Sequence, residues 1–208
     1  MSDTSLSGIR SAQHRADMDL LSIVRINEEI KRVVSVSFKI NIMALNAIFL
    51  AKRAGTAALG FGVLSNELRV FSQDLRTCME SLTGLIHQCV NEVSLVLQDI
   101  RNSRLLREAV QISPHYPAEH VMAGRDALNS AHEQKLSGLR RQLKRALEDA
   151  FQMVELGGVL AKSAKIEAAY GQGFAASLAQ VSGEFDGIVE EIRGSLESLR
   201  RSSFFTAF

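Results

Sequence analysis

Apolar and small residues recur along this chain in alternating steps of three and four positions, which is the spacing of a coiled-coil helix. A Gly-bracketed break, Gly55 to Gly60 (GTAALG), separates two such stripes. The stripes consist of Ile26, Ile30, Val33, Ser37, Ile40, Ala44, Ala47, Ala51 and Ala54 before the break, and of Phe61, Leu64, Leu68, Phe71, Leu75, Cys78, Leu82, Leu85 and Cys89 after it. We therefore predict an antiparallel hairpin of two long helices, the second running from about residue 59 to about residue 108.

The second half of the chain shows the same plan. A third stripe ends at the break Gly171-Gln172-Gly173, and a fourth stripe follows it. These stripes consist of Leu136, Leu139, Leu143, Ala146, Ala150, Met153, Gly157, Leu160 and Ala164, and of Phe174, Leu178, Val181, Phe185, Ile188, Ile192, Ser195 and Leu199. The only two prolines, Pro114 and Pro117, lie between the halves and bias their preceding residues to extended geometry. We predict a linker there, at residues 109–123.

Two helices alone cannot bury stripes of this length, so we predict an all-α fold, an antiparallel four-helix bundle or coiled coil made of the two long hairpins. The predicted segments are a flexible Ser-rich N-terminus (1–16), hairpin 1 (17–108), the linker (109–123), hairpin 2 (124–203) and an apolar tail (204–208) that packs on the bundle or is disordered. Gly60-Phe61 and Gly173-Phe174 hold equivalent places, which indicates an internal duplication. The alternative is the general likeness of any two Ala-rich heptad hairpins.

Composition narrows the classes of partner. The 24 basic and 23 acidic side chains leave a net charge of +1, so we expect no nucleic acid and no anionic membrane as the main partner. Cys78 and Cys89 lie on one predicted helix, about 16 Å apart along its axis, and cannot form a disulfide. The polar N-terminus lacks a signal peptide, and the longest uncharged apolar run, Ile40 to Ala51, is too short to span a bilayer. We expect a cytoplasmic protein without membrane insertion.

Candidate chemistry is sparse. His115 and His120 lie in the predicted linker without cysteines or carboxylates at metal-ligand spacing. His132, in AHEQKLSG, is faintly similar to the phosphorylated helix of histidine phosphotransfer domains, but the Lys-Gly pair that follows such a histidine is missing. No phosphate-binding loop follows a strand, and no nucleophile–base set is indicated. We predict that the chain is not an enzyme and has no catalytic residue, cofactor or metal.

The residues around the first break match a family pattern without a gap. The pattern is I-N-x-L-A-L-N-A-x-x-E-A-A-R-A-G-E-x-G-x-G-F-A-V-V-A-x-E-V-R, and it is matched by Ile40-Asn41, Ala44-Leu45-Asn46-Ala47, Ala51, Arg53-Ala54-Gly55, Gly60-Phe61, Val63, Glu67 and Arg69. Over these residues, about 35 in all, the chain resembles the cytoplasmic signalling tip of the methyl-accepting chemotaxis receptors. An amphipathic helix alone would not place Asn41, Asn46 and Arg53 in this register.

The resemblance implies a role in protein–protein interaction. In receptors of this family two chains pair into a four-helix rod, its tip binds a histidine kinase and its coupling protein, and three dimers join through the tip. The residues that would inherit such contacts are Phe38, Ile42, Asn46, Arg53, Phe61, Val63, Glu67 and Arg69. Receptors are also methylated at paired Glu or Gln residues; Glu190-Glu191 fits half of that pattern, and a solvated helix face is the preferred interpretation.

Three positions depart from the family pattern. Leu50 replaces the acidic residue of E-A-A-R, Thr56 replaces the tip glutamate, and Leu59 replaces the basic residue before Gly-Phe. Together with Phe49, the two leucines would form an exposed apolar patch, which usually marks a partner site; packing inside an altered tip is the alternative. The predicted partner-binding set is therefore the inherited residues plus Phe49, Leu50, Thr56 and Leu59.

These observations predict a soluble, non-enzymatic chemotaxis signalling protein. It would bind a chemotaxis histidine kinase, its coupling protein or both through the hairpin tip, with receptors as further partners, and would be a monomeric pseudo-dimer or a homodimer. Two alternatives remain open: a truncated soluble chemoreceptor that acts as a homodimer, and a phosphotransfer-type relay at His132.

Overall fold

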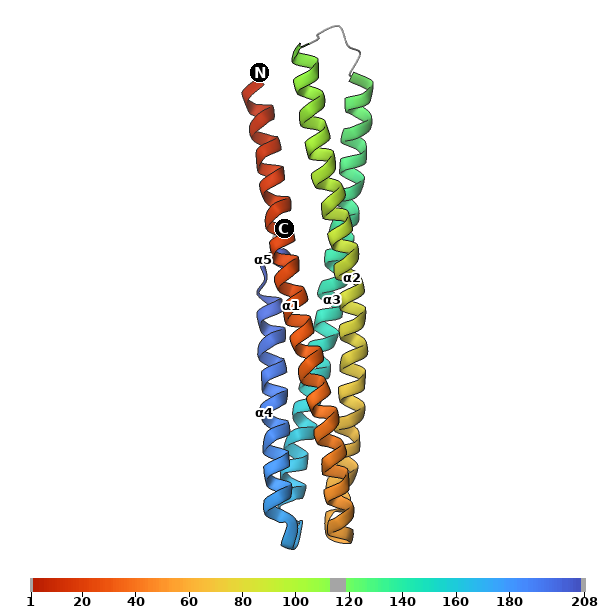
Figure 1. Cartoon of the computed structure of the whole chain (residues 1–208), viewed down its shortest axis with the longest axis vertical. Coiled ribbons are helices and arrows are strands. Elements are labelled where there is room, and N and C mark those ends of the chain that lie inside the picture. The colour runs from red at the N-terminus through yellow and green to blue at the C-terminus, as the bar shows by residue number, and fades with distance from the viewer. Residues whose placement is uncertain (1, 113–118, 207–208) are drawn as a thin grey trace. The chain divides into compact units, whose positions relative to one another are not determined.

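The computed structural model describes residues 2–112 and 119–206, and these residues are almost entirely helical, with no strand among them (Figure 1). The elements in chain order are α1 (Ser2–Ala54), the 3-10 turn η1 (Gly55–Ala58), α2 (Leu59–Ile112), α3 (Glu119–Ala168), the 3-10 turn η2 (Gln172–Phe174), α4 (Ala175–Arg200) and α5 (Ser203–Thr206). The predicted all-α class and the two helical hairpins are confirmed.

The helices extend further than the sequence predicted. α1 begins at Ser2, although residues 1–16 were expected to be flexible. Ala16 is buried and Ala12 is half-buried, so small residues continue the core stripe into this segment. Residues 109–112 and 119–123, assigned to the linker, are helical, because a proline restricts only itself and its immediate neighbours. The two prolines and His115 lie outside the described residues.

The described chain forms two compact units, and each unit combines segments of both predicted hairpins. One unit, here called the tip unit, comprises Asn27–Thr83 and Lys144–Arg201, and therefore holds both turns. The other, here called the terminal unit, comprises Met1–Ile26, Gly84–Leu143 and Ser202–Phe208. Within the tip unit, η1 and η2 lie at the same end (Figure 1).

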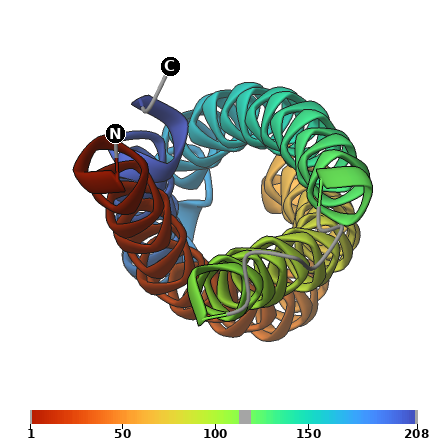
Figure 2. The same cartoon turned by 90° about the horizontal axis from the view of Figure 1, so that it is seen from above.

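Helices that are consecutive in the chain pack side by side in the tip unit. A Cβ on Gly157 of α3 would meet the ring of Phe71 from α2, and a Cβ on Gly158 would lie 3.8 Å from Val189 of α4. A Cβ on Gly62 of α2 would lie 3.3 Å from that of Ala51 in α1. Seen along their axes, the helices follow one another around the bundle in chain order, so α1 and α3 are diagonally opposite (Figure 2).

The predicted stripes locate most core positions of the two units to within one residue. On α1, every predicted position from Ile26 to Ala51 is buried. On the later helices some neighbours of the predicted residues are buried instead: Met79 for Cys78, Ile86 for Leu85, Leu147 for Ala146, Val154 for Met153 and Val189 for Ile188. A helix enclosed by two neighbours buries a face wider than a strict two-position heptad stripe, which explains the difference.

Serines occupy several core positions without loss of hydrogen bonding. The Ser37 hydroxyl donates to the carbonyl of Val34 over 2.8 Å, and the Ser65 hydroxyl donates to the carbonyl of Phe61 over the same distance. Each buried hydroxyl is thus satisfied by its own helix. This explains how Ser37 can lie within an otherwise apolar stripe.

The C-terminal tail packs in the terminal unit. α5 buries Phe204 and Phe205, and the hydroxyls of Ser203 and of Ser22 in α1 lie 3.0 Å apart. The guanidinium of Arg140 in α3 stacks over the Phe204 ring at 4.7 Å. Figures 1 and 2 both show α5 beside α1. The described residues of the tail therefore pack against α1 and α3, while Phe208 lies outside the described residues.

Candidate functional site: the hairpin tip

A single left-handed residue makes the first turn. Gly55 has a φ of 68°, a conformation that costs a residue with a Cβ about 1–2 kcal/mol and glycine almost nothing. The 3-10 turn that starts there places the end of α1 next to the start of α2. The second turn instead places Gln172 at a φ of 47°, so the two turns are built differently.

An open groove of about 590 Å³ lies beside the first turn, and most of its lining is apolar. It is lined by Ile48, Ala51, Lys52, Gly55, Ala58, Leu59, Gly62, Val63 and Asn66. Small residues form much of the surface, because α1 and α2 approach closely at Ala51 and Gly62. The structure thus provides a hollow into which apolar side chains of a partner can insert.

Most of the predicted partner-binding residues are on the surface. Leu59 and Val63 lie at the groove and are 66% and 63% exposed. Leu50 and Arg69 are half-buried, so Leu50 contributes less to an apolar patch than its place in the sequence suggested. The other exposed members of the set are Phe38, Ile42, Asn46, Phe49, Arg53, Thr56 and Glu67.

Phe61 is the exception. Its side chain is fully buried, so the prediction that it contacts a partner is wrong for this residue. The heptad pattern already placed Phe61 in the core stripe, and that assignment is the correct one. Its role is to fill the bundle next to the turn.

The groove also contains residues that sequence reasoning missed. Ile48, Lys52 and Asn66 line it, together with the small residues Ala58 and Gly62. A possible signal was the concentration of small residues on both sides of the turn, which permits close helix packing. Which residues the turn brings together nevertheless depends on how the two helices meet.

Charged residues between α2 and α3 in the terminal unit enclose His132. Its Nδ1 lies 2.9 Å from Oε2 of Glu92, and its Nε2 lies 3.9 Å from Oδ2 of Asp99. Lys135 pairs with the other carboxylate oxygen of Glu92, and Arg125 lies 4.0 Å from Asp99. The hydrogen bond from Lys135 is the main reason why the pKa of Glu92 lies below its ordinary value.

This arrangement argues against the phosphotransfer alternative. Both ring nitrogens of His132 face buried carboxylates, and the side chain is mostly enclosed. A phosphoryl group on either nitrogen would have to displace a carboxylate and would be repelled by it. His132 is therefore better explained as a polar link between α2 and α3.

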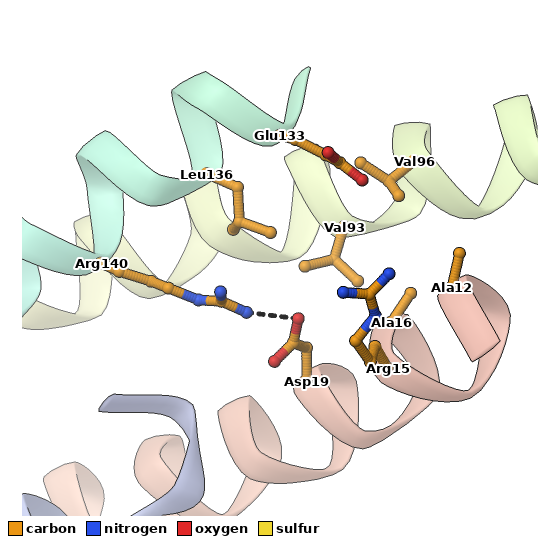
Figure 3. A pocket seen from close by; sticks show the side chains of 9 residues that line it. All are labelled: Ala12, Arg15, Ala16, Asp19, Val93, Val96, Glu133, Leu136 and Arg140. Carbon is orange, nitrogen blue, oxygen red and sulfur yellow. Dashed lines mark hydrogen bonds and ion pairs between the residues drawn. The ribbon is translucent and has the colours of Figure 1, made fainter. Parts of the chain in front are cut away.

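A polar cavity of about 200 Å³ lies in the terminal unit among α1, α2 and α3 (Figure 3). Arg140 of α3 crosses it to pair with Asp19 of α1, while Val93 and Leu136 form apolar wall. Burial raises the pKa of Asp19, against the opposing effect of Arg140. The Nε of Arg140 is buried without a hydrogen-bond partner, so one N–H donor of this guanidinium is not satisfied by the described residues.

Other candidate chemistry has a structural explanation. Cys78 and Cys89 are both free thiols, as predicted, and burial raises the pKa of Cys89 to about 11. Within the described part of the chain, no three His, Cys, Asp or Glu side chains are placed to hold a metal ion. Glu190 and Glu191 are exposed on α4, and Glu190 pairs with Arg193 at 3.6 Å.

One helical stretch within Arg10–Val110 is long and apolar enough, at a mean hydropathy of 1.8, to cross a membrane. Only 33% of it is buried in the fold. Length and composition alone are weak grounds for a membrane span, because core helices of soluble proteins satisfy the same criterion. The absence of membrane insertion therefore stays a prediction.

Comparison with known proteins indicates the class of signalling protein that this chain resembles. The chain is similar to methyl-accepting chemotaxis proteins, which supports a role in chemotaxis signal transduction. It is 27% identical over 123 residues to methyl-accepting chemotaxis protein McpN of Pseudomonas aeruginosa, covering 59% of this chain and 22% of that protein. It is 35% identical over 69 residues to methyl-accepting chemotaxis protein IV of Escherichia coli, covering 33% and 13%. The chain thus spans less than a quarter of either relative, and no family model and no solved structure matches.

Proposed function

We propose that this chain is a cytoplasmic, non-enzymatic chemotaxis signalling protein that binds a chemotaxis histidine kinase or its coupling protein through the groove at the first hairpin turn. The observation that carries the proposal is the apolar groove with exposed Leu59 and Val63 on its lining. It lies in the stretch that resembles a receptor tip, in a chain similar to methyl-accepting chemotaxis proteins.

The physical argument rests on burial of apolar surface. Complete burial of a Leu or Val side chain contributes about 1.5–3 kcal/mol, so Leu59 and Val63 can together supply much of a micromolar affinity. The small residues beneath them let partner side chains approach the backbone closely, while Lys52 and Asn66 provide polar groups at the margin. Apolar anchors in a pocket with a polar rim are the usual anatomy of an interaction hot spot.

α1 carries further exposed apolar side chains before the turn. Ile42 and Phe49 are exposed seven residues apart, one heptad, on the helix that leads into the turn. A partner that inserted into the groove and also contacted this face would bury a continuous apolar area. Because one chain contributes four helices to the tip unit, this proposal needs no second chain to complete the bundle.

The test is a binding measurement with the purified kinase and coupling protein of the same organism. Leu59→Glu and Val63→Glu should each weaken binding at least tenfold, because each places a charge in an apolar contact. Val24→Glu is the matched control: Val24 is 59% exposed on α1 in the terminal unit, and its variant should bind normally. Circular dichroism confirms that all three variants fold. Undiminished binding by both groove variants would refute the proposed site.

A further inference from the structure

The polar cavity of the terminal unit contains a buried donor for which the described residues supply no acceptor. The cavity has a volume of about 200 Å³ and lies among α1, α2 and α3 (Figure 3). The Arg140 guanidinium pairs with Asp19 and lies 4.7 Å from the centre of the Phe204 ring, so it is held in place from two sides. Its Nε remains without a hydrogen-bond partner. Because an unsatisfied buried donor costs free energy, this N–H favours a ligand that brings an acceptor into the cavity.

The charges around the cavity favour a ligand without net charge. Asp19 and Arg140 are mostly enclosed, while Arg15 and Glu133 are exposed and therefore lie at the solvent side of the lining. The lining thus carries two charges of each sign. An anion would be repelled by Asp19 and Glu133, and a cation would be repelled by the two arginines. A neutral molecule avoids both penalties.

The single free donor of Arg140 narrows the chemistry further. Carboxylates usually bind an arginine through two parallel N–H groups. Here Nη2 of Arg140 already pairs with Asp19, so Nε offers one N–H and not an unoccupied fork. One N–H suits one carbonyl oxygen. An amide also carries N–H donors, which the carboxylates on the lining can accept.

The walls and the volume set the rest of the ligand. Val93, Val96 and Leu136 provide apolar surface opposite the charged groups. A cavity of about 150 Å³ can hold benzene, so this cavity has room for about eight non-hydrogen atoms. A short branched aliphatic chain fills such a space and buries its surface against these side chains.

We propose that this cavity binds a small primary amide with a short aliphatic chain, whose carbonyl oxygen accepts a hydrogen bond from Nε of Arg140. The amide N–H groups donate to the carboxylates of Asp19 or Glu133, and the aliphatic chain packs on the valines and Leu136. The site lies in the terminal unit, whereas the proposed kinase-binding groove lies in the tip unit. Its test needs only the full chain, so the two proposals can fail separately.

Titration calorimetry of the full chain with isovaleramide tests the ligand class. A ligand of this size should bind with a dissociation constant of about 0.1–10 mM. Isovalerate and isoamylamine are matched controls, because they place a carboxylate or an ammonium group on the same aliphatic chain. Each should bind at least tenfold more weakly than the amide. Equal or tighter binding of either charged analogue would overturn the proposal, and so would the absence of saturable amide binding, which would indicate a cavity filled by solvent only.

The Nε–H of Arg140 gives a direct readout of the contact. In nitrogen-15 NMR spectra of the arginine side chains, one Nε–H signal should shift on saturation with isovaleramide, and Arg140→Lys identifies it by removing it. This variant keeps a positive charge beside Asp19 but lacks the Nε–H, so its affinity for the amide should fall at least tenfold. Circular dichroism checks that it folds. A signal of Arg140 that stays unshifted at saturation would refute the proposed hydrogen bond.

A variant that fills the cavity tests the location without altering the ion pair. Ala12 is half-buried on the lining, so Ala12→Leu should occupy part of the space and weaken amide binding at least tenfold. Ala131→Leu is the matched control, because Ala131 is exposed on α3 in the same unit and outside the cavity, and this variant should bind as the parent does. Amide binding that survives Ala12→Leu unchanged would place the ligand elsewhere and refute the site.

Discussion

Gly157 offers the sharpest test of how α2 and α3 are held together below the tip. A Cβ at this position would lie 2.5 Å from Cζ of Phe71 and 2.8 Å from its Cε1 and Cε2. Ordinary carbon–carbon contacts lie at about 3.5–4.0 Å, so the ring would have to retreat by about 1 Å. Phe71 is buried, which leaves little room for that movement. Gly157→Ala should therefore strain the interface between these helices.

The size of the effect follows from two opposing terms. Adding a methyl group to a packed core costs about 1–3 kcal/mol. Alanine is favoured over glycine in a helix interior by about 1 kcal/mol, which offsets part of that cost. Gly187→Ala in α4 isolates the second term, because nothing lies within 4 Å of a Cβ built there. We expect Gly187→Ala to stabilise the chain by up to about 1 kcal/mol, and Gly157→Ala to be about 1–3 kcal/mol less stable than Gly187→Ala.

Urea unfolding followed by circular dichroism measures both variants, with equal slopes confirming comparable transitions. A double-mutant cycle with Phe71→Leu assigns the cause: the smaller side chain should make room, so the cost of Gly157→Ala should fall in the Phe71→Leu background. If Gly157→Ala stabilised the chain as much as Gly187→Ala does, the close contact between Gly157 and Phe71 would be refuted.

Three further predictions concern the terminal unit and the second turn. The pKa of Glu92 is lowered in the folded state, chiefly by the hydrogen bond from Lys135, so ionised Glu92 stabilises the fold above its unfolded pKa and this stabilisation is lost as the pH falls through the folded pKa. In urea titrations below about pH 4.3, the unfolding free energy of the parent should therefore fall more steeply than that of Glu92→Gln. Phe204→Ala should cost about 3 kcal/mol in thermal unfolding, whereas Phe38→Ala, on the surface, should change stability by less than about 0.5 kcal/mol. Gln172→Gly should stabilise the chain by up to about 1 kcal/mol, since glycine relieves the left-handed backbone at φ 47°; an unchanged melting temperature would contradict this.

The heptad pattern predicted the helices because helical periodicity is local. A helix places residues at this spacing on one of its faces, whatever surrounds it. The structure buries such residues, for example Ile30, Ile40 and Ala47. The same reasoning failed at residues 109–112 and 119–123. The two prolines nearby suggested a linker that included these residues. Proline restricts only adjacent residues, so α2 continues to Ile112 and α3 begins at Glu119.

The candidate site was predictable in its place but not in its shape. The Gly-bracketed break located the turn, and the pattern around it located the exposed Leu59 and Val63. Phe61, two residues from each of them, belongs to the core, and the resemblance to receptors alone did not separate the two cases. The groove depends on the close approach of Ala51 and Gly62, which belong to different helices.

By itself, the sequence determined the helices, the two turns and most of the buried positions, because these follow from spacing and from the residues that interrupt a helix. Only the tertiary structure decided which distant residues meet. Asp19 and Arg140 are 121 positions apart, and Phe204 packs under the same arginine. The hollow beside the turn and the cavity that Arg140 crosses likewise depend on which helices are neighbours. Local periodicity orients each helix, whereas contacts between helices are set by packing, which no single segment specifies.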